Sequence, residues 1–332
     1  MRKRFIIGLI CLSATATAQE AQRLHTLGKN YLVDGDYANA EAMLVSALAA
    51  DTANPAIIKD LSLCYYFEKE FQKGLTLILP VMGTTTCDDQ CYQLAGNLYK
   101  GSGQSGEAER VFREGIARFP QSGPLYSELG ELKAQGKSPE SIALWERGIE
   151  NDPAYPRNYY HACRYYAGTP ELLRGLLYAE IYINMDPQGT RTSEIKELLL
   201  SGYRDYFRQR ASYEPVADKI RFLARVSKSL DRQSTSVKEI NTQTLTIIRT
   251  RFIIDWYQDR SDRYLAYRLF EFHRELLRKG LFEAYNQWVF GPADQLQKFQ
   301  SWTQLHGTEY AALLKWIRNK PFTMPPGQHY YR

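Results

Sequence analysis

The sequence contains little of what metal or nucleophile chemistry requires. Five histidines occur among 332 residues, and none of them forms the spaced pair of a zinc-binding helix. The glycines form no phosphate-binding or dinucleotide-binding fingerprint, and no serine stands in a G-x-S-x-G turn. Adjacent acidic residues such as Asp88 and Asp89 lie where a helix is expected to begin, and carboxylates cap helix N-termini. We therefore expect no enzyme activity, no catalytic residue, no cofactor and no metal site, with an unrecognised enzyme as the distant alternative.

Long apolar runs are also missing, apart from one at the start of the chain. Residues 1–4 carry three basic side chains, residues 5–12 are apolar and residues 13–18 are small or polar. This order is typical of a secretory signal peptide. The apolar run is much shorter than the roughly twenty residues of a membrane helix. We expect cleavage near Gln19, with an N-terminal membrane anchor as the alternative, no transmembrane helix after cleavage, and an exported protein that is periplasmic or secreted.

Cysteine is scarce. Beyond the expected signal peptide the chain has Cys64, Cys87, Cys91 and Cys163, and an exported protein folds where disulfides can form. Cys87 and Cys91 are four residues apart where a loop enters a predicted helix, and they are the candidate disulfide pair, with two free thiols as the alternative. A zinc site would also need Cys64 and Cys163, which fall in separate helical segments.

Neither sign of charge dominates the chain, but its two halves differ. Residues 19–187 contain 15 basic and 22 acidic side chains, whereas residues 188–332 contain 24 and 15. The basic half suggests an alternative function, a structural envelope protein that contacts an anionic surface or polymer, with its densest charge at Arg274, Arg278 and Lys279. Because no nucleic-acid-binding module is recognisable and an export signal is expected, we expect no nucleic acid partner.

The dominant pattern is a repeat of about thirty-four residues. A short motif recurs every 34 residues, and a fifth copy follows after 33: Leu27-Gly28, Leu61-Ser62, Ala95-Gly96, Leu129-Gly130 and Ala162-Cys163. A second motif follows each copy, a small residue and then, except in the fifth, a large one four positions later: Ala40 with Leu44, Gly74 with Ile78, Ala108 with Phe112, Ser141 with Trp145 and Gly175 with Ala179. Between the two motifs, turn signals lie at residues 34–36, 101–103 and 135–137.

This pattern resembles the tetratricopeptide repeat (TPR) family. The resemblance implies an all-α, right-handed α-solenoid of helix hairpins, in repeats at about 21–54, 55–88, 89–122, 123–155 and 156–187. Repeats 2 and 5 depart from the family pattern. Ser62 and Cys163 replace its tight-packing glycine, and Gly74 and Gly175 replace its alanine, so those two hairpins are the ones expected to be distorted.

The resemblance also implies a concave groove lined by the first helix of each hairpin. The matching positions are His25, Lys29, Lys59, Gln93, Asn97, Lys100, Ser127, Glu131, Tyr160 and Arg164. Such a groove binds a peptide or a helix of a partner protein, and its basic members would favour acidic groups. The alternative is a merely solvated face. We expect a non-catalytic adaptor or scaffold of the bacterial cell envelope whose partner is another protein.

Residues 188–332 read as further helices that continue or cap the solenoid. Periodic apolar residues predict helices within 195–206, 216–230, 245–257 and 264–281, followed by two more at 282–289 and 293–317, interrupted at Gly291-Pro292 and loosened at Gly307. The aromatic segment 282–291 is interpreted as packed core, with a ligand slot as the alternative. Residues 321–327 should be extended and lie along the last helices.

Overall fold

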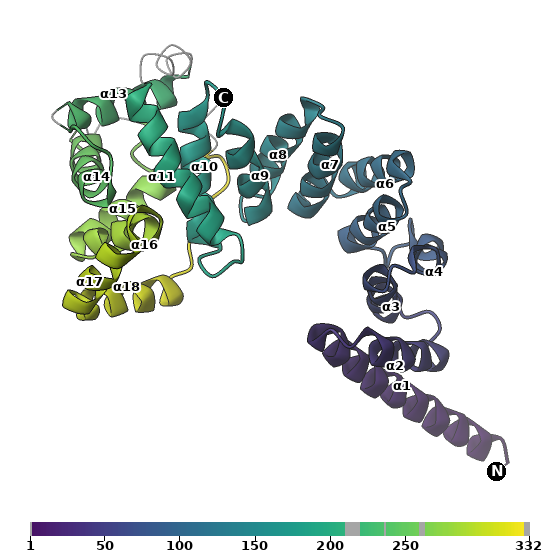
Figure 1. The fold of residues 1–332 in the computed structure, drawn as a ribbon. Helices are drawn as coiled ribbons and strands as arrows, with labels where there is room; N and C mark the ends of the chain where they lie inside the picture. Colours follow the sequence, from purple (N-terminus) through teal and green to yellow (C-terminus); the bar gives the residue numbers. More distant parts are fainter. Residues whose placement is uncertain (1, 210–219, 236, 259–262, 329–332) are drawn as a thin grey trace. The chain divides into compact units, whose positions relative to one another are not determined.

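The computed structural model describes residues 2–209, 220–235, 237–258 and 263–328, and every regular element in these ranges is helical (Figure 1). The chain forms two compact units, residues 1–141 and 142–332. The division falls inside the fourth predicted repeat, whereas the sequence analysis separated the repeats from a C-terminal region at residue 187. No helix within the described ranges is both long enough and apolar enough to span a membrane.

The first unit consists of consecutive helix hairpins. Its first helices are α1 (Arg2–Asp34), α3 (Pro55–Phe67), α5 (Asp89–Gly101) and α7 (Gly123–Gln135), and its second helices are α2 (Tyr37–Ala50), α4 (Phe71–Ile78), α6 (Ser105–Arg118) and the start of α8 (Glu140–Asn151). Helices α3, α5 and α7 begin at the predicted repeat starts, and successive first helices contact one another. The predicted all-α fold of TPR-like hairpins is confirmed. Helix α1 runs unbroken through the expected cleavage position.

Local sequence explains where these helices begin. Asn54 caps α3 by accepting hydrogen bonds from two main-chain N–H groups, and Pro55 occupies the first helical position. Asp88 caps α5 by accepting from the N–H of Cys91, and Asp36 caps α2 in the same way. The acidic residues at these helix starts are therefore caps, as predicted.

The reversals inside the first four hairpins share one backbone conformation. Each places one residue in the left-handed region, 34 residues after the last: Gly35 (φ 76°), Lys69 (62°), Gly103 (79°) and Lys137 (55°). The N–H of this residue bonds to the carbonyl three positions back, and the next N–H to the carbonyl five positions before its own residue, which is the Schellman motif. The predicted turn at 135–137 thus depends on Lys137, because Gly136 has a φ of −80°.

Close helix packing explains the glycines of the first and third repeats. A Cβ on Gly28 would lie 2.7 Å from the side chain of Leu44, and a Cβ on Gly96 would lie 2.2 Å from the ring of Phe112. Leu44 and Phe112 are the large residues of the second motif, and both are fully buried. Each first helix therefore leaves room for a large side chain of its own hairpin.

Repeats 2 and 5 keep this close approach by moving the glycine to the other helix. A Cβ on Gly74 or Gly175 would lie 3.3 Å from the carbonyl oxygen of Ser62 or Cys163 respectively. The second helix of the fifth hairpin is regular over 14 residues. The expected distortion of this hairpin is therefore wrong, because Gly175 on the second helix preserves the close packing. In the second hairpin α4 has only eight residues before the 3-10 turn η1 (Leu79–Val81), because Pro80 lacks the N–H that would continue the helix.

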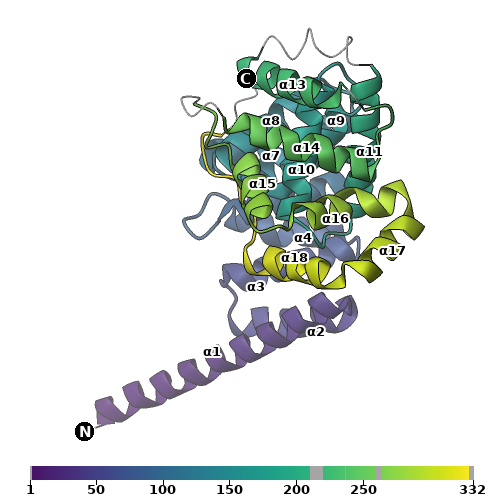
Figure 2. The ribbon, with the colours of Figure 1, turned by 90° about the vertical axis from the view of Figure 1, so that its left-hand side faces the viewer.

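Within the described ranges, the second unit contains, besides most of α8, the fifth hairpin and seven further helices. These are α9 (Pro156–Tyr166) and α10 (Leu172–Met185), then α11 (Thr192–Arg208), α13 (Arg221–Ser234), α14 (Thr242–Trp256), α15 (Arg268–Arg278), α16 (Phe282–Asp294), α17 (Leu296–Leu305) and α18 (Gly307–Asn319). Helices α11 and α16 lie side by side, as do α13 and α14 (Figures 1 and 2).

Two predicted helix limits in this unit are wrong and one cannot be compared. Helix α16 continues through Pro292 to Asp294, and the break falls at Gln295. Gly307 begins α18 instead of loosening a longer helix. The predicted start at residue 216 lies outside the described residues. The aromatic segment is core, as predicted, because Phe282, Tyr285 and Phe290 are buried.

A polar cluster is buried in the second unit. Glu180 on α10 accepts hydrogen bonds from Arg249 on α14 and from Tyr285 on α16, and its Oε1 lies 3.0 Å from Nε2 of His273 on α15. Arg249 also donates to Asn286. Burial and the nearby Arg249 charge lower the pKa of His273 well below its ordinary value. The cluster joins four helices through one carboxylate.

Candidate functional site

The predicted groove residues of the first unit lie on consecutive first helices, and three of them contact a carboxylate that belongs to, or caps, the following first helix. Nε2 of His25 on α1 lies 2.6 Å from Oδ2 of Asp60 on α3. Nζ of Lys59 on α3 lies 2.5 Å from Oδ2 of Asp88. A third contact of 2.6 Å joins Nζ of Lys100 on α5 to Glu128 on α7. We call His25–Asp60, Lys59–Asp88 and Lys100–Glu128 the inter-repeat ladder.

The ladder changes the electrostatics expected of this face. Lys59 and Lys100 are about one-fifth exposed and ion-paired within the protein, so their charge is not free to select acidic ligands. Burial alone would raise the pKa of Asp88, but the hydrogen bond and charge of Lys59 hold it below its ordinary value. Lys29 is exposed on α1. The predicted preference for acidic groups therefore has less support in this unit than the count of lysines suggests.

Asn97 lies among these contacts, but its side-chain oxygen accepts no hydrogen bond from them. It lies on α5 within one turn of Gln93 and Lys100, and Gln93 donates to Glu128 at 3.4 Å. Glu131 lies 3.5 Å from Lys100. The side-chain oxygen of Asn97 is buried and accepts no hydrogen bond from any residue that the structure describes. Such an unsatisfied acceptor costs about 1–3 kcal/mol, so it requires an explanation. Ser127, the remaining predicted residue of this face, is buried on α7.

The last two predicted residues form a similar contact in the second unit. Arg164 on α9 donates to the hydroxyl of Tyr160 at 2.9 Å, and its Nε lies 3.1 Å from Oε1 of Glu194 on α11. Tyr160 donates to the same carboxylate at 3.2 Å. The guanidinium of Arg191 lies 4.8 Å from the Tyr160 ring centroid, a cation–π distance. The link between first helices thus continues from the fifth hairpin to α11.

The sequence analysis missed the carboxylates of these contacts. Each stands about one repeat length after its basic partner, at separations of 35, 29 and 28 residues in the ladder. A search for acidic residues at this spacing would have found Asp60, Asp88 and Glu128. Such a search would also have found Glu194, which lies beyond the last predicted repeat.

The candidate disulfide pair lies at the start of α5. Cys87 and Cys91 are buried and free, and burial together with a hydrogen bond to Cys87 raises the pKa of Cys91 to about 12. The disulfide stays a prediction. Within the described ranges no group of three or more His, Cys, Asp or Glu side chains is arranged to hold a metal ion.

The first unit also has an open hollow between its first two hairpins, of about 540 Å³. Its lining is mostly apolar and comes from α2, α3 and α4, including Val45, Leu48, Leu61, Tyr65 and Leu77, with Lys73 at its edge. None of the predicted groove residues lines it. The hollow and the ladder are therefore separate surfaces.

Comparison with known proteins adds solved structures of low similarity. No family model and no curated protein matches the chain. Similar structures include a thermophilic TPR protein of Thermus thermophilus (15% identical, covering 55% of this chain and 98% of that one, TM-score 0.45) and PilF of Pseudomonas aeruginosa (15%, 61% and 91%, 0.49). A TPR protein of Parabacteroides merdae is 16% identical over 78% of this chain and 98% of that one, with a TM-score of 0.42. Because these scores are below 0.5, the repeat character rests on the hairpins, turns and glycines described above.

Proposed function

We propose that this chain of TPR-like helix hairpins is a non-catalytic adaptor or scaffold that binds a partner protein on the face carrying the inter-repeat ladder. The architecture supports this, because consecutive first helices present a continuous row of polar side chains. The observation that carries the proposal is the buried, unsatisfied oxygen of Asn97. Asn97 as a whole residue is partly exposed, so a rotation of its side chain would bring the buried oxygen to a bound chain.

The ligand that fits this face is an extended segment. Once the Asn97 side chain has rotated outward, a main-chain N–H of such a segment would satisfy its oxygen, and main-chain hydrogen bonds are how extended peptides bind protein surfaces. The ladder holds the neighbouring side chains in fixed positions before binding, which lowers the ordering cost of association. Recognition would thus depend on hydrogen bonds as well as charge, with Lys29 as an exposed cation of this face.

We also propose that the protein acts in the bacterial cell envelope after export. The support is the basic and apolar start of the sequence, residues 1–18. Sequencing the N-terminus of protein recovered from the envelope fraction tests this. Recovery of a chain that begins near Gln19 is the expected result, and an intact N-terminus in the cytoplasmic fraction would contradict it.

The binding test is in-cell crosslinking followed by mass spectrometry, with Asn97→Leu as the variant. This change removes the amide without breaking an ion pair, whereas changing Lys59 or Lys100 would also disrupt the ladder. We expect the partner to be lost while the thermal midpoint stays the same or rises, since an unsatisfied acceptor is removed. Asn30→Leu, at an exposed position of α1, is the matched control. Equal recovery of the partner by both variants would overturn the proposed site.

A further inference from the structure

Residues 321–325 form an extended tail, followed by a turn at residues 326–327, and this segment lies on the second unit in the manner of a bound peptide. Beyond α18, Phe322 and Met324 are each only 4% exposed, and Nζ of Lys320 lies 2.6 Å from Oε2 of Glu275 on α15. Alternate side chains of an extended chain point to the same side. Positions 320, 322 and 324 therefore contact the unit from one side of the tail.

The aromatic anchor of the tail is held by α15. The ring of Phe322 meets that of Phe272 edge to face, with centroids 5.1 Å apart. The guanidinium of Arg268 lies 5.4 Å from the Phe322 centroid and 5.9 Å from the Phe272 centroid. Arg268 and Phe272 are one turn apart on α15, so a single helix face forms this part of the seat.

The polar anchor is Gln328, which pairs with main-chain groups at the start of α15. Its Oε1 accepts a hydrogen bond from the N–H of Arg268 at 2.6 Å, and its Nε2 donates to the carbonyl of Ala266 at 2.6 Å. The N–H of Arg268 stands at the first position of α15, where it has no partner inside the helix. The tail thus supplies a specific pair of hydrogen bonds, one accepted and one donated by the Gln328 amide, that an unrelated apolar segment would not make.

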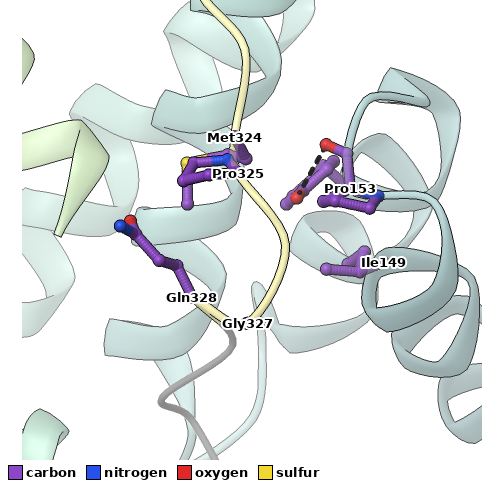
Figure 3. Close-up of a pocket in the computed structure, with 7 residues that line it drawn as sticks. Ile149, Pro153, Met324, Pro325, Gly327 and Gln328 are labelled. Carbon is purple, nitrogen blue, oxygen red and sulfur yellow. Dashed lines mark hydrogen bonds between the residues drawn. The ribbon is translucent and has the colours of Figure 1, made fainter.

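The opposite wall of the seat is the α8–α9 connection. Figure 3 shows the tail passing Ile149 and Pro153 on one side, while Gln328 points to the other. The space left among these residues is about 10 Å³, at the lower limit of what one water molecule needs. Within this wall the hydroxyl of Tyr159 donates to the carbonyl of Pro153 at 3.1 Å, a contact that involves no residue of the tail.

We propose that residues 320–328 are an intramolecular ligand, and that their seat is a binding site for an extended peptide of the form Phe-x-Met-Pro-Pro-x-Gln. Within the described ranges no main-chain hydrogen bond joins residues 321–328 to the rest of the unit, so side chains alone hold the tail. Pro325 and Pro326 restrict the free segment to extended conformations, which lowers the cost of ordering it. The same segment supplied in trans, as a peptide or from a second copy, meets the same contacts.

The test is binding of a fluorescent synthetic peptide of residues 320–328 to two full-length proteins, the wild type and the variant Phe322→Ala/Met324→Ala. The tethered tail competes at an effective concentration of about millimolar. We therefore expect the variant to bind the peptide at least about tenfold more tightly than the wild type. A peptide with alanine in place of its Phe and Met should bind neither protein.

Two results would overturn the proposal. One is a variant with the circular dichroism spectrum of the wild type that does not bind the peptide, because the seat would then not be a separable site. The other is equal binding by both proteins, which would place the peptide elsewhere. If the double variant does not fold, Gln328→Ala, which removes only the polar anchor, decides the outcome by the same criteria, with a smaller expected gain in affinity.

Discussion

The left-handed residue in each of the first four hairpin turns allows a direct test of how these repeats are stabilised. In the second and fourth repeats this residue is a lysine, Lys69 or Lys137, at φ values of 62° and 55°. A side chain other than glycine costs roughly 1–2 kcal/mol there, whereas glycine adds about 0.5–1 kcal/mol of unfolded-state entropy. We therefore expect Lys137→Gly to raise the free energy of unfolding by about 0.5–1 kcal/mol.

The first and third repeats supply the reverse substitution, since Gly35 and Gly103 occupy the same position. A Cβ on either would meet nothing within 4 Å, so the only cost of Gly103→Lys is the backbone conformation, and we expect a loss of about 1 kcal/mol. Gly136→Ala is the control, because it lies next to Lys137 at a φ of −80°. It should be neutral or slightly stabilising.

All three changes are measured by urea unfolding followed by circular dichroism. The quantity compared is the urea midpoint of the transition of the first unit, provided that the denaturant slope does not change. Opposite shifts for Lys137→Gly and Gly103→Lys are the expected result. The reasoning would be refuted if Lys137→Gly lowered the midpoint, or if Gly103→Lys left it unchanged while Gly136→Ala shifted it.

Three further predictions concern packing and the buried cluster. Gly96→Ala should destabilise the first unit by about 1–3 kcal/mol because its Cβ would meet the ring of Phe112. Gly106→Ala is the control and should not destabilise it, because a Cβ there meets nothing within 4 Å. The two variants are compared by their urea midpoints. Arg249→Met should cost about 3–5 kcal/mol by leaving the Glu180 carboxylate buried without its cation, and a thermal midpoint for the second unit equal to that of the wild type would contradict this. His273 has a lowered pKa and stays neutral in the folded state, so the unfolded chain binds the extra proton below about pH 6.5. Stability should therefore be complete above about pH 7.5 and fall by up to about 1.4 kcal/mol per pH unit below 6.5, and this slope should be smaller in His273→Gln when thermal midpoints are measured across pH 5 to 8.

The repeat period made the hairpins predictable, because helix crossings demand a small residue at fixed intervals. Gly28 and Gly96 therefore predicted the position of each first helix and its close contact with the second helix of the same hairpin. The exchange that places Gly74 and Gly175 opposite Ser62 and Cys163 was not predictable from the family pattern. It depends on which of the two packed helices carries the glycine, and the sequence pattern alone does not specify this.

The candidate site was only partly predictable for a similar reason. The sequence shows how many cationic side chains the face carries but not which carboxylates they contact. Lys59 and Lys100 were therefore expected to be available to a ligand. Their carboxylates come from the next repeat, and only the packing of successive helices brings the two together. The seat of the tail was less predictable still, since the main-chain groups that bind Gln328 exist as a pair only once α15 has formed.

The buried cluster also has a consequence for the order in which the chain can be completed during synthesis. Glu180 emerges with α10, but its partners Arg249 and Tyr285 follow 69 and 105 residues later. At typical rates of about 5–20 residues per second, α10 exists for several seconds without the groups that neutralise its carboxylate. The hairpins of the first unit contact mainly their sequence neighbours and can form one after another as they leave the ribosome. The second unit, in contrast, completes this cluster only after residue 285 has been synthesised.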